Sequence, residues 1–242
     1  DAITDYLAWY ERHRKAYTEV KRRAEVEILP VFDARKVSDL DSASIRRWHE
    51  DLAHRPKRAR GRAGETGRAL EPPKTVDERR KRKASANRIL TILKAALNHA
   101  YREGLAQTDD AWRRVKPFKN VDAPTIRYLT DDECVRLVNA CEPDFQSLVM
   151  AALYTGCRYG ELINLICSDF NRETGTVLIR ESKSGKPRHV TLADDGIALF
   201  EQVTAGRMAH EHIFRRDDGE SWGKSHQQRP LRYACQRARI EP

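Results

Sequence analysis

The 242-residue sequence lacks several features that would direct it to a membrane, a metal or an oxidising compartment. It has no apolar run long enough to cross a bilayer, and we identify no secretory signal in it. Its five cysteines include no CxxC pair, and His210-Glu211-His212 does not have the HExxH spacing of a metalloprotease. We therefore expect no disulfide framework, no metal site and a reducing cytoplasm. Because the first residue is Asp1 rather than Met, we expect further residues before it.

Acidic residues are in deficit, with 36 Asp and Glu against 45 Lys and Arg, for a net charge of +9. Residues 55–83 hold 12 basic and 4 acidic residues, and therefore most of this imbalance. The first part of this stretch is rich in glycine and proline and almost without apolar residues, so we predict a flexible basic loop over about 55–75. A solvated linker is the alternative, but the density of positive charge favours contact with a polyanion such as DNA.

The first half of the chain predicts a small helical domain over residues 1–118. Apolar residues recur at helical spacing over residues 3–28, after the capping residues Asp41 and Ser42, and over residues 84–104. A polar connector at 119–124 follows this domain.

The second half, residues 125–242, predicts a mixed domain. Two short alternating stretches, 176–181 and 188–192, flank Ser184-Gly185 and predict a β-hairpin. Helices are predicted from Thr130, over 145–154, near Arg158, after the capping residues Asp194 and Asp195, and over 225–239. The expected fold class is therefore mainly α with a small β-hairpin or sheet, in two domains.

The block Thr155-Gly-Cys-Arg-Tyr-Gly-Glu-Leu162 is the most informative stretch. Arg158 opens a helix, where a positive charge is unfavourable for stability but suited to binding phosphate oxygens. Glu161, three residues later, shares a helix face with Arg158 and can hold it in place. From the residues alone, an ordinary ion pair and a phosphate site are equally favoured.

This block, with the Ser182–Lys186 stretch of the predicted hairpin, resembles the tyrosine recombinase family of phage-type integrases. The resemblance places the family's first catalytic arginine at Arg158, its supporting acid at Glu161 and its hairpin lysine at Lys183, with Lys186 less favoured. It implies a core-binding domain over 1–118 and an incomplete α+β catalytic domain over 125–242.

The resemblance also implies chemistry and partners. Arg158 would stabilise the charged phosphorus centre and Lys183 would protonate the leaving 5′-oxygen, while a tyrosine forms a 3′-phosphotyrosyl bond. No metal or other cofactor is required. The expected partners are double-stranded DNA attachment sites and three further protomers at synapsis, in a bacterium or phage-infected cell where a viral genome or mobile element integrates. The expected DNA-binding residues are Arg82, Lys83, Arg88, Lys94, Lys186 and Arg188.

The family continues with a His-x-x-Arg block and a late tyrosine, which these 242 residues do not show. We therefore expect this chain to be a truncated recombinase that binds DNA without forming a covalent adduct. Tyr233 does not match the family's nucleophile and is expected in the core or at an interface. A DNA-binding protein that never cuts and a type IB topoisomerase are the alternatives.

Overall fold

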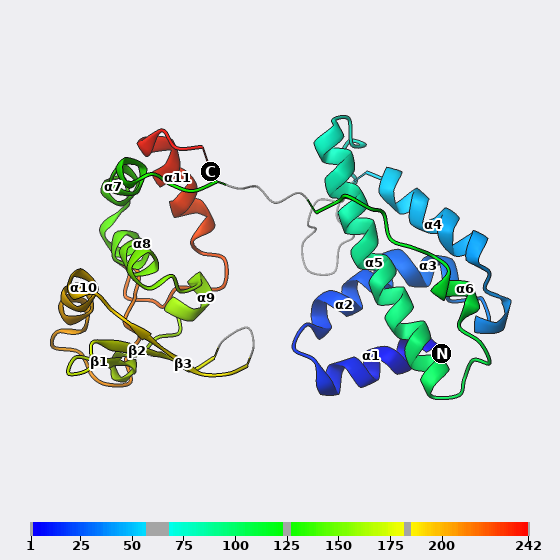
Figure 1. Ribbon diagram of the computed structural model, residues 1–242, viewed down its shortest axis with the longest axis horizontal. Helices are drawn as coiled ribbons and strands as arrows, with labels where there is room; N and C mark the ends of the chain where they lie inside the picture. Colours follow the sequence, from blue (N-terminus) through cyan, green and yellow to red (C-terminus); the bar gives the residue numbers. More distant parts are fainter. Residues whose placement is uncertain (1, 57–67, 123–126, 182–184, 242) are drawn as a thin grey trace. The chain divides into compact units, whose positions relative to one another are not determined.

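The structure is a computed structural model that describes residues 2–56, 68–122, 127–181 and 185–241. Residues 57–67 of the predicted basic loop, and Lys183, lie outside this part of the chain. The chain divides into two compact units, Asp1–Thr125 and Ile126–Pro242, which are described separately (Figure 1).

The N-terminal unit is built from helices packed around one long helix. Its elements are α1 (Ala2–His13), α2 (Tyr17–Arg23), the π-helical turn η1 (Ala24–Ile28), α3 (Leu29–Phe32), the 3-10 turn η2 (Val37–Asp39), α4 (Ser42–His54), α5 (Val76–Arg102) and α6 (Asp110–Arg113). Helices α1 and α4 both pack on α5 (Figure 1). The face of α5 that carries Ile89, Leu93 and Leu97 is buried, as its 3.6-residue period predicts.

Two predictions for this unit need correction. Residues 3–28 do not form one helix, because α1 ends at His13 and the chain turns before α2. Residues 11–16 are all exposed, so no core contact holds a continuous helix there. The long helix also begins at Val76 rather than near residue 84. Thr75 and Glu78 form a capping box that starts it, with the Thr75 hydroxyl accepting from the Glu78 N–H at 3.1 Å.

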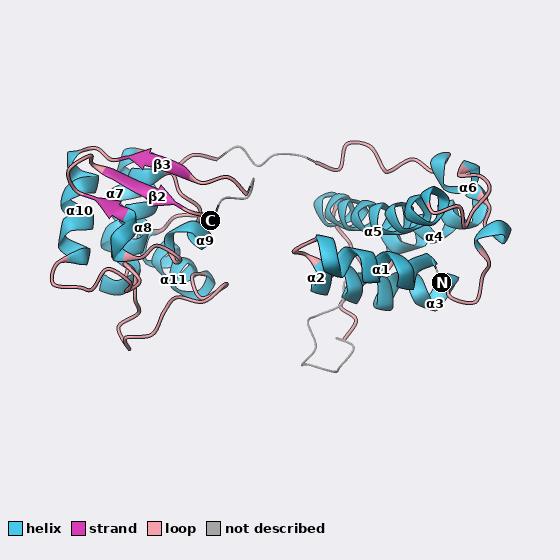
Figure 2. Ribbon diagram, turned by 90° about the horizontal axis from the view of Figure 1, so that it is seen from below, coloured by secondary structure: helices cyan, strands magenta, loops and turns pink. Residues whose placement is uncertain are grey.

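The C-terminal unit combines helices with a small sheet, and this mainly helical fold with few strands confirms the predicted class. Its elements are α7 (Asp131–Asn139), α8 (Pro143–Thr155), α9 (Tyr159–Leu162), the 3-10 turn η3 (Cys167–Asp169), β1 (Phe170–Asn171), β2 (Thr176–Ile179), β3 (Arg188–Thr191), α10 (Asp194–Thr204) and α11 (Gln228–Ala238). The strands form an antiparallel sheet in the order β1-β2-β3 (Figure 2). In this register Val177 lies opposite Val190.

Alternation in β2 and β3 identified the hairpin, but β1 has only two residues and no detectable period. The helix after the hairpin begins at Asp194 with Ala193 as its N-cap, so Asp194 and Asp195 lie in the first turn and do not cap it. Both carboxylates still face the positive end of the helix dipole. The last helix starts at Gln228 rather than at residue 225.

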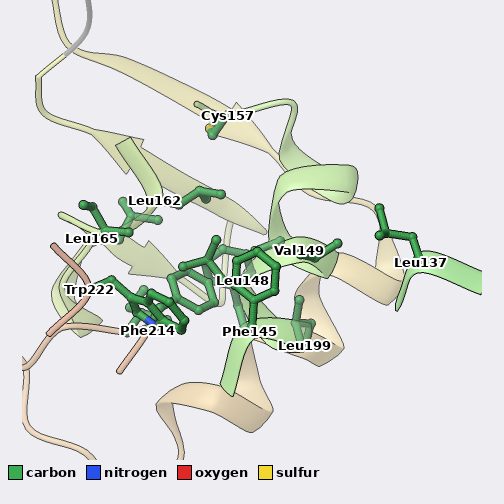
Figure 3. Close-up of a cluster of buried hydrophobic side chains, with 14 of the residues drawn as sticks. Leu137, Phe145, Leu148, Val149, Cys157, Leu162, Leu165, Leu199, Phe214 and Trp222 are labelled. Atoms are coloured by element: carbon green, nitrogen blue, oxygen red, sulfur yellow. The ribbon is translucent and has the colours of Figure 1, made fainter. Parts of the chain in front are cut away.

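The core of the C-terminal unit forms around α8 (Figure 3). Phe145, Leu148 and Val149 of this helix are buried, and the Phe145 ring lies 5.5 Å from that of Trp222. Helix α8 ends at Thr155 and is followed by its C-cap Gly156, which has a φ of 62°. Glycine adopts this left-handed conformation without a steric penalty, so the chain reverses there and leads directly into Arg158.

Two further observations concern the described residues as a whole. No helix among them is long and apolar enough to cross a membrane. All five cysteines are free thiols, and Cys157 and Cys235 are buried.

Candidate functional site

Arg158 lies in the turn between α8 and α9, where it is the N-cap residue of α9. The short helix places Glu161 directly beneath it, and the Glu161 carboxylate accepts the Arg158 backbone N–H at 2.9 Å. In return, the Glu161 N–H donates to the Arg158 carbonyl at 2.9 Å. These reciprocal bonds fix the backbone of Arg158 relative to a buried side chain.

Glu161 is buried, with 8% of the residue exposed, and it accepts hydrogen bonds from two arginines. Arg188 of β3 binds both carboxylate oxygens, through Nη1 at 3.0 Å and Nη2 at 2.8 Å. Arg158 makes one longer contact, from Nη1 to Oε1 at 3.3 Å. The hydrogen bonds from Arg188 are the main cause that lowers the pKa of the Glu161 carboxyl from 4.5 to about 2. Glu161 is therefore a carboxylate at neutral pH.

The guanidinium of Arg158 remains largely open to solvent. Its side chain is 66% exposed, whereas that of Arg188 is 38% exposed. Among the described residues, the one side-chain hydrogen bond of Arg158 is made by Nη1, so four of its five N–H donors have no partner there. From the sequence we expected the N-terminus of the helix to help Arg158 bind phosphate. Because α9 has only four residues, its dipole adds little to this site. The cationic fork of Arg158 is the feature that can bind an oxyanion.

The remaining predicted site residues of this unit lie on or between β2 and β3. Lys183 lies outside the residues that the structure describes. Lys186 is exposed just before β3. Arg188, predicted to contact DNA, has its guanidinium engaged by Glu161 instead.

The four predicted DNA-binding cations of the N-terminal unit are all on α5, but they differ in their surroundings. Arg82 donates through Nε to the Arg55 carbonyl at 2.8 Å, and Lys94 donates to the Val115 carbonyl at 3.1 Å. Burial lowers the pKa of both groups. Lys83 and Arg88 are exposed. Among the described residues, the Lys83 ammonium lies 5.6 Å from the centroid of the Phe118 ring, so Arg88 is the more accessible of the two cations.

Arg88 also lines a cleft of about 920 Å³ beside the first turns of α5. Lys81 and Arg88 are seven residues apart on one face of the helix, with the smaller Ala84 and Ser85 between them, and all four line this cleft. Five basic and three acidic residues line the cleft, so its net positive charge suits a phosphate backbone.

A third basic surface, on α11, was missed by the sequence analysis. Arg229 donates through Nε to the Tyr233 hydroxyl at 3.2 Å, and this bond is the main cause that lowers the tyrosine's pKa. The guanidinium of Arg232 lies 5.6 Å from the same ring. Tyr233 is 42% exposed and lines a cleft of about 880 Å³, so it does not lie in the core, and the alternative expectation of an interface stays a prediction. The spacing of Arg229, Arg232 and Gln236 along one helix face would have revealed this surface.

Comparisons with known proteins agree with this architecture. The phage integrase family matches residues 127–242. The tyrosine recombinase XerA of Saccharolobus solfataricus is 25% identical over 99 residues, which cover 40% of this chain and 34% of XerA. The putative defective protein IntQ of Escherichia coli is 29% identical over 143 residues, which cover 53% of this chain and 35% of IntQ. The matched region is thus about a third of the length of these curated relatives.

Among solved structures, a lambda integrase dimer bound to a COC′ core site has a TM-score of 0.71 at 17% identity, covering 99% of this chain and 82% of the integrase chain. A lambda integrase tetramer bound to a Holliday junction also has a TM-score of 0.71, at 16% identity, covering 100% of this chain and 66% of the other. The Tn1549 transposon integrase in complex with transposon right end DNA has a TM-score of 0.62 at 13% identity, covering 93% and 74%. These likenesses show the fold. The phage integrase family matches almost the whole C-terminal unit, and it is this unit that is similar to the tyrosine recombinases.

Proposed function

We propose that the protein is a site-specific DNA recombinase that cuts and rejoins DNA through a 3′-phosphotyrosyl intermediate. The observation that carries this proposal is the exposed guanidinium of Arg158, fixed at its base by the buried carboxylate of Glu161. A cation held in this way is preorganised to bind a phosphodiester without reorganising when charge develops.

In the proposed reaction, the oxygen of a tyrosine hydroxyl attacks the phosphorus of the scissile phosphodiester and gives up its proton to a general base or to water. The bond from phosphorus to the tyrosine oxygen forms and the bond to the 5′-oxygen breaks. Arg158 binds the non-bridging oxygens, where negative charge increases in the transition state. Lys183 gives its proton to the departing 5′-oxygen as a general acid. We assign the nucleophile to no residue of the chain.

The proposed substrate is double-stranded DNA carrying an attachment site. Solved relatives of the same fold are a lambda integrase dimer on a core site and a lambda integrase tetramer on a Holliday junction, which support DNA binding and assembly of four protomers. The cleft beside α5, lined by five basic and three acidic residues, supplies one surface of the appropriate charge. We assign α5 to the core-binding unit, residues 1–118, and α11 to the catalytic unit, residues 125–242. The expected cytoplasmic location follows from this substrate and stays a prediction.

A covalent-adduct assay tests the proposed function. The natural full-length protein is incubated with nicked DNA containing its recombination site, and protein-linked DNA is resolved on a denaturing gel. We expect the natural protein to form an adduct. For Arg158→Ala, the rate of adduct formation should be lower by about a hundredfold or more. Arg172→Ala is the matched control, because Arg172 is a 77% exposed arginine of the same unit that pairs with Glu201 outside the site.

The alternative is a DNA-binding protein on the same scaffold that does not cut. The name of the relative IntQ, a putative defective protein, is the observation that keeps this alternative. DNA binding without any adduct from the natural protein would favour it and would overturn the proposed recombinase activity.

A further inference from the structure

Arg188 was expected to contact DNA, yet its side chain points to a different role. Both of its terminal nitrogens bind the Glu161 carboxylate, and Nη2 also lies 3.9 Å from the Cys157 sulfur. Two arginines therefore face one buried carboxylate, and Arg188 holds it in the stronger, bidentate geometry.

We propose that Arg188 is a positioning residue that keeps the guanidinium of Arg158 open for phosphate by occupying Glu161. The inference rests on the proposed function in one respect, that Arg158 binds a phosphate.

The physical reason is competition for one anion. Glu161 lies three residues after Arg158, a spacing at which the two side chains can form a close pair. A bidentate pair with Glu161 would engage the same fork of donors that a phosphate needs. Because Arg188 takes both carboxylate oxygens, Arg158 keeps, within the part of the chain that the structure describes, a single side-chain contact of 3.3 Å, and its side chain stays 66% exposed.

Charge supports the same role. Without Arg188, the buried carboxylate and Arg158 would cancel each other's charge and leave a neutral site. With Arg188, two guanidinium groups share one carboxylate, so a net positive charge remains at the exposed end. Arg188 also joins β3, the strand that follows the Lys183 segment, to the turn that carries Arg158.

The test uses DNA affinity and a rescue variant. We expect Arg188→Gln to weaken binding of attachment-site DNA about tenfold, the scale of one charge-assisted hydrogen bond to a phosphate, because Glu161 then closes on Arg158. Adding Glu161→Gln to that variant should restore most of the affinity, since a neutral amide does not compete for Arg158. A DNA-contacting Arg188 would instead give a loss that Glu161→Gln does not restore, and that outcome overturns the proposal.

Arg180→Gln is the matched control. Arg180 binds the buried carboxylate of Asp169 at 2.5 Å in the same unit, with its own side chain 54% exposed. It should lower stability in a similar way and leave DNA affinity unchanged. Equal loss of affinity in both variants would mean that Arg188 acts only through folding, which also overturns the proposal.

A second readout needs no DNA. NMR signals of the Arg158 guanidinium in the free protein should change from those of an open group to those of a paired one in Arg188→Gln, but not in Arg180→Gln. Unchanged Arg158 signals in Arg188→Gln would overturn the proposal directly. If Arg158→Ala does not alter DNA affinity, the proposal that Arg158 binds a phosphate is wrong. The NMR result then decides by itself whether Arg188 keeps Arg158 open.

Discussion

The side-chain amide of Asn87 forms hydrogen bonds with both backbone groups of Phe118. Nδ2 donates to the Phe118 carbonyl and Oδ1 accepts from the Phe118 N–H, each at 2.9 Å. Asn87 is the centre of a ladder of side chains on α5. Seven residues to either side, Arg80 donates to the Val121 carbonyl at 2.8 Å and Lys94 donates to the Val115 carbonyl at 3.1 Å.

The spacing of this ladder has a geometric reason. Seven residues of α-helix rise about 10.5 Å, which three residues of chain can span when extended. Carbonyls three residues apart in the segment 115–121 therefore meet side chains seven residues apart on α5, and the segment runs antiparallel to the helix. The ladder supplies partners for backbone groups that no secondary structure satisfies.

The first prediction concerns Asn87. Asn87→Ala removes both hydrogen bonds to Phe118 and also the partner of the buried His49 ring, whose Nε2 lies 3.1 Å from Oδ1. We expect the free energy of unfolding of the N-terminal unit to fall by about 2–3 kcal/mol, because buried polar groups lose their partners. Urea denaturation measures this, with the exposed α5 residue Arg79 changed to Ala as the control. Equal stability of the two variants would contradict the ladder.

The second prediction is a pH dependence that originates at His49. This histidine is 2% exposed and stacks on Phe118 with 4.2 Å between the ring centroids. Burial lowers its pKa below the ordinary 6.5, because a buried imidazolium loses its hydration. The unfolded chain therefore takes up a proton near pH 6.5 that the folded unit excludes, so stability falls as the pH drops below this value.

Denaturation curves between pH 7.5 and 5 are predicted to show this loss in the wild type and a smaller one in His49→Gln. His54→Gln is the matched control, since His54 is an exposed histidine of the same helix. If His49→Gln keeps the wild-type slope, the pH dependence arises elsewhere.

The third prediction separates the cations of α5 into two kinds. Arg88→Ala should weaken DNA binding and reduce the slope of log affinity against log salt by about 1, because an exposed phosphate contact is lost. Lys94→Ala should mainly cost stability, about 1 kcal/mol for its hydrogen bond to Val115. Filter binding over a range of salt, with urea denaturation of both variants, distinguishes the two. An unchanged slope for Arg88→Ala would remove this residue from the DNA interface.

Features set by nearby residues could be predicted from the sequence, whereas contacts between distant residues could not. The period of Ile89, Leu93 and Leu97 predicted the buried face of α5, because one hydrophobic face is encoded locally. The environment of Lys94 was not predictable, since its partner lies 21 residues away and is a backbone carbonyl without any sequence signal. Arg188 and Glu161 are 27 residues apart, so their pairing required the fold of the hairpin onto α9. By contrast, Arg158 and Glu161 share one turn, and their contact followed from spacing alone.

The last prediction concerns Gly156, the left-handed residue two positions before Arg158. A Cβ at this position would meet no atom within 4 Å, so the cost of Gly156→Ala is that of the backbone conformation alone. We expect the free energy of unfolding to fall by about 1 kcal/mol, and by less for Gly156→Asn, because asparagine tolerates φ near +60° better than alanine.

Gly160→Ala is the matched control: Gly160 lies within α9, where a Cβ also has open space but φ is not positive. This change should be neutral or stabilise the unit slightly, because alanine restricts the unfolded chain. Thermal denaturation with the DNA affinity of each variant tests the idea, and we expect affinity to fall only for the Gly156 variants, in which the turn that aims Arg158 is strained. Equal effects of Gly156→Ala and Gly160→Ala would show that the left-handed turn has no role in placing the arginine.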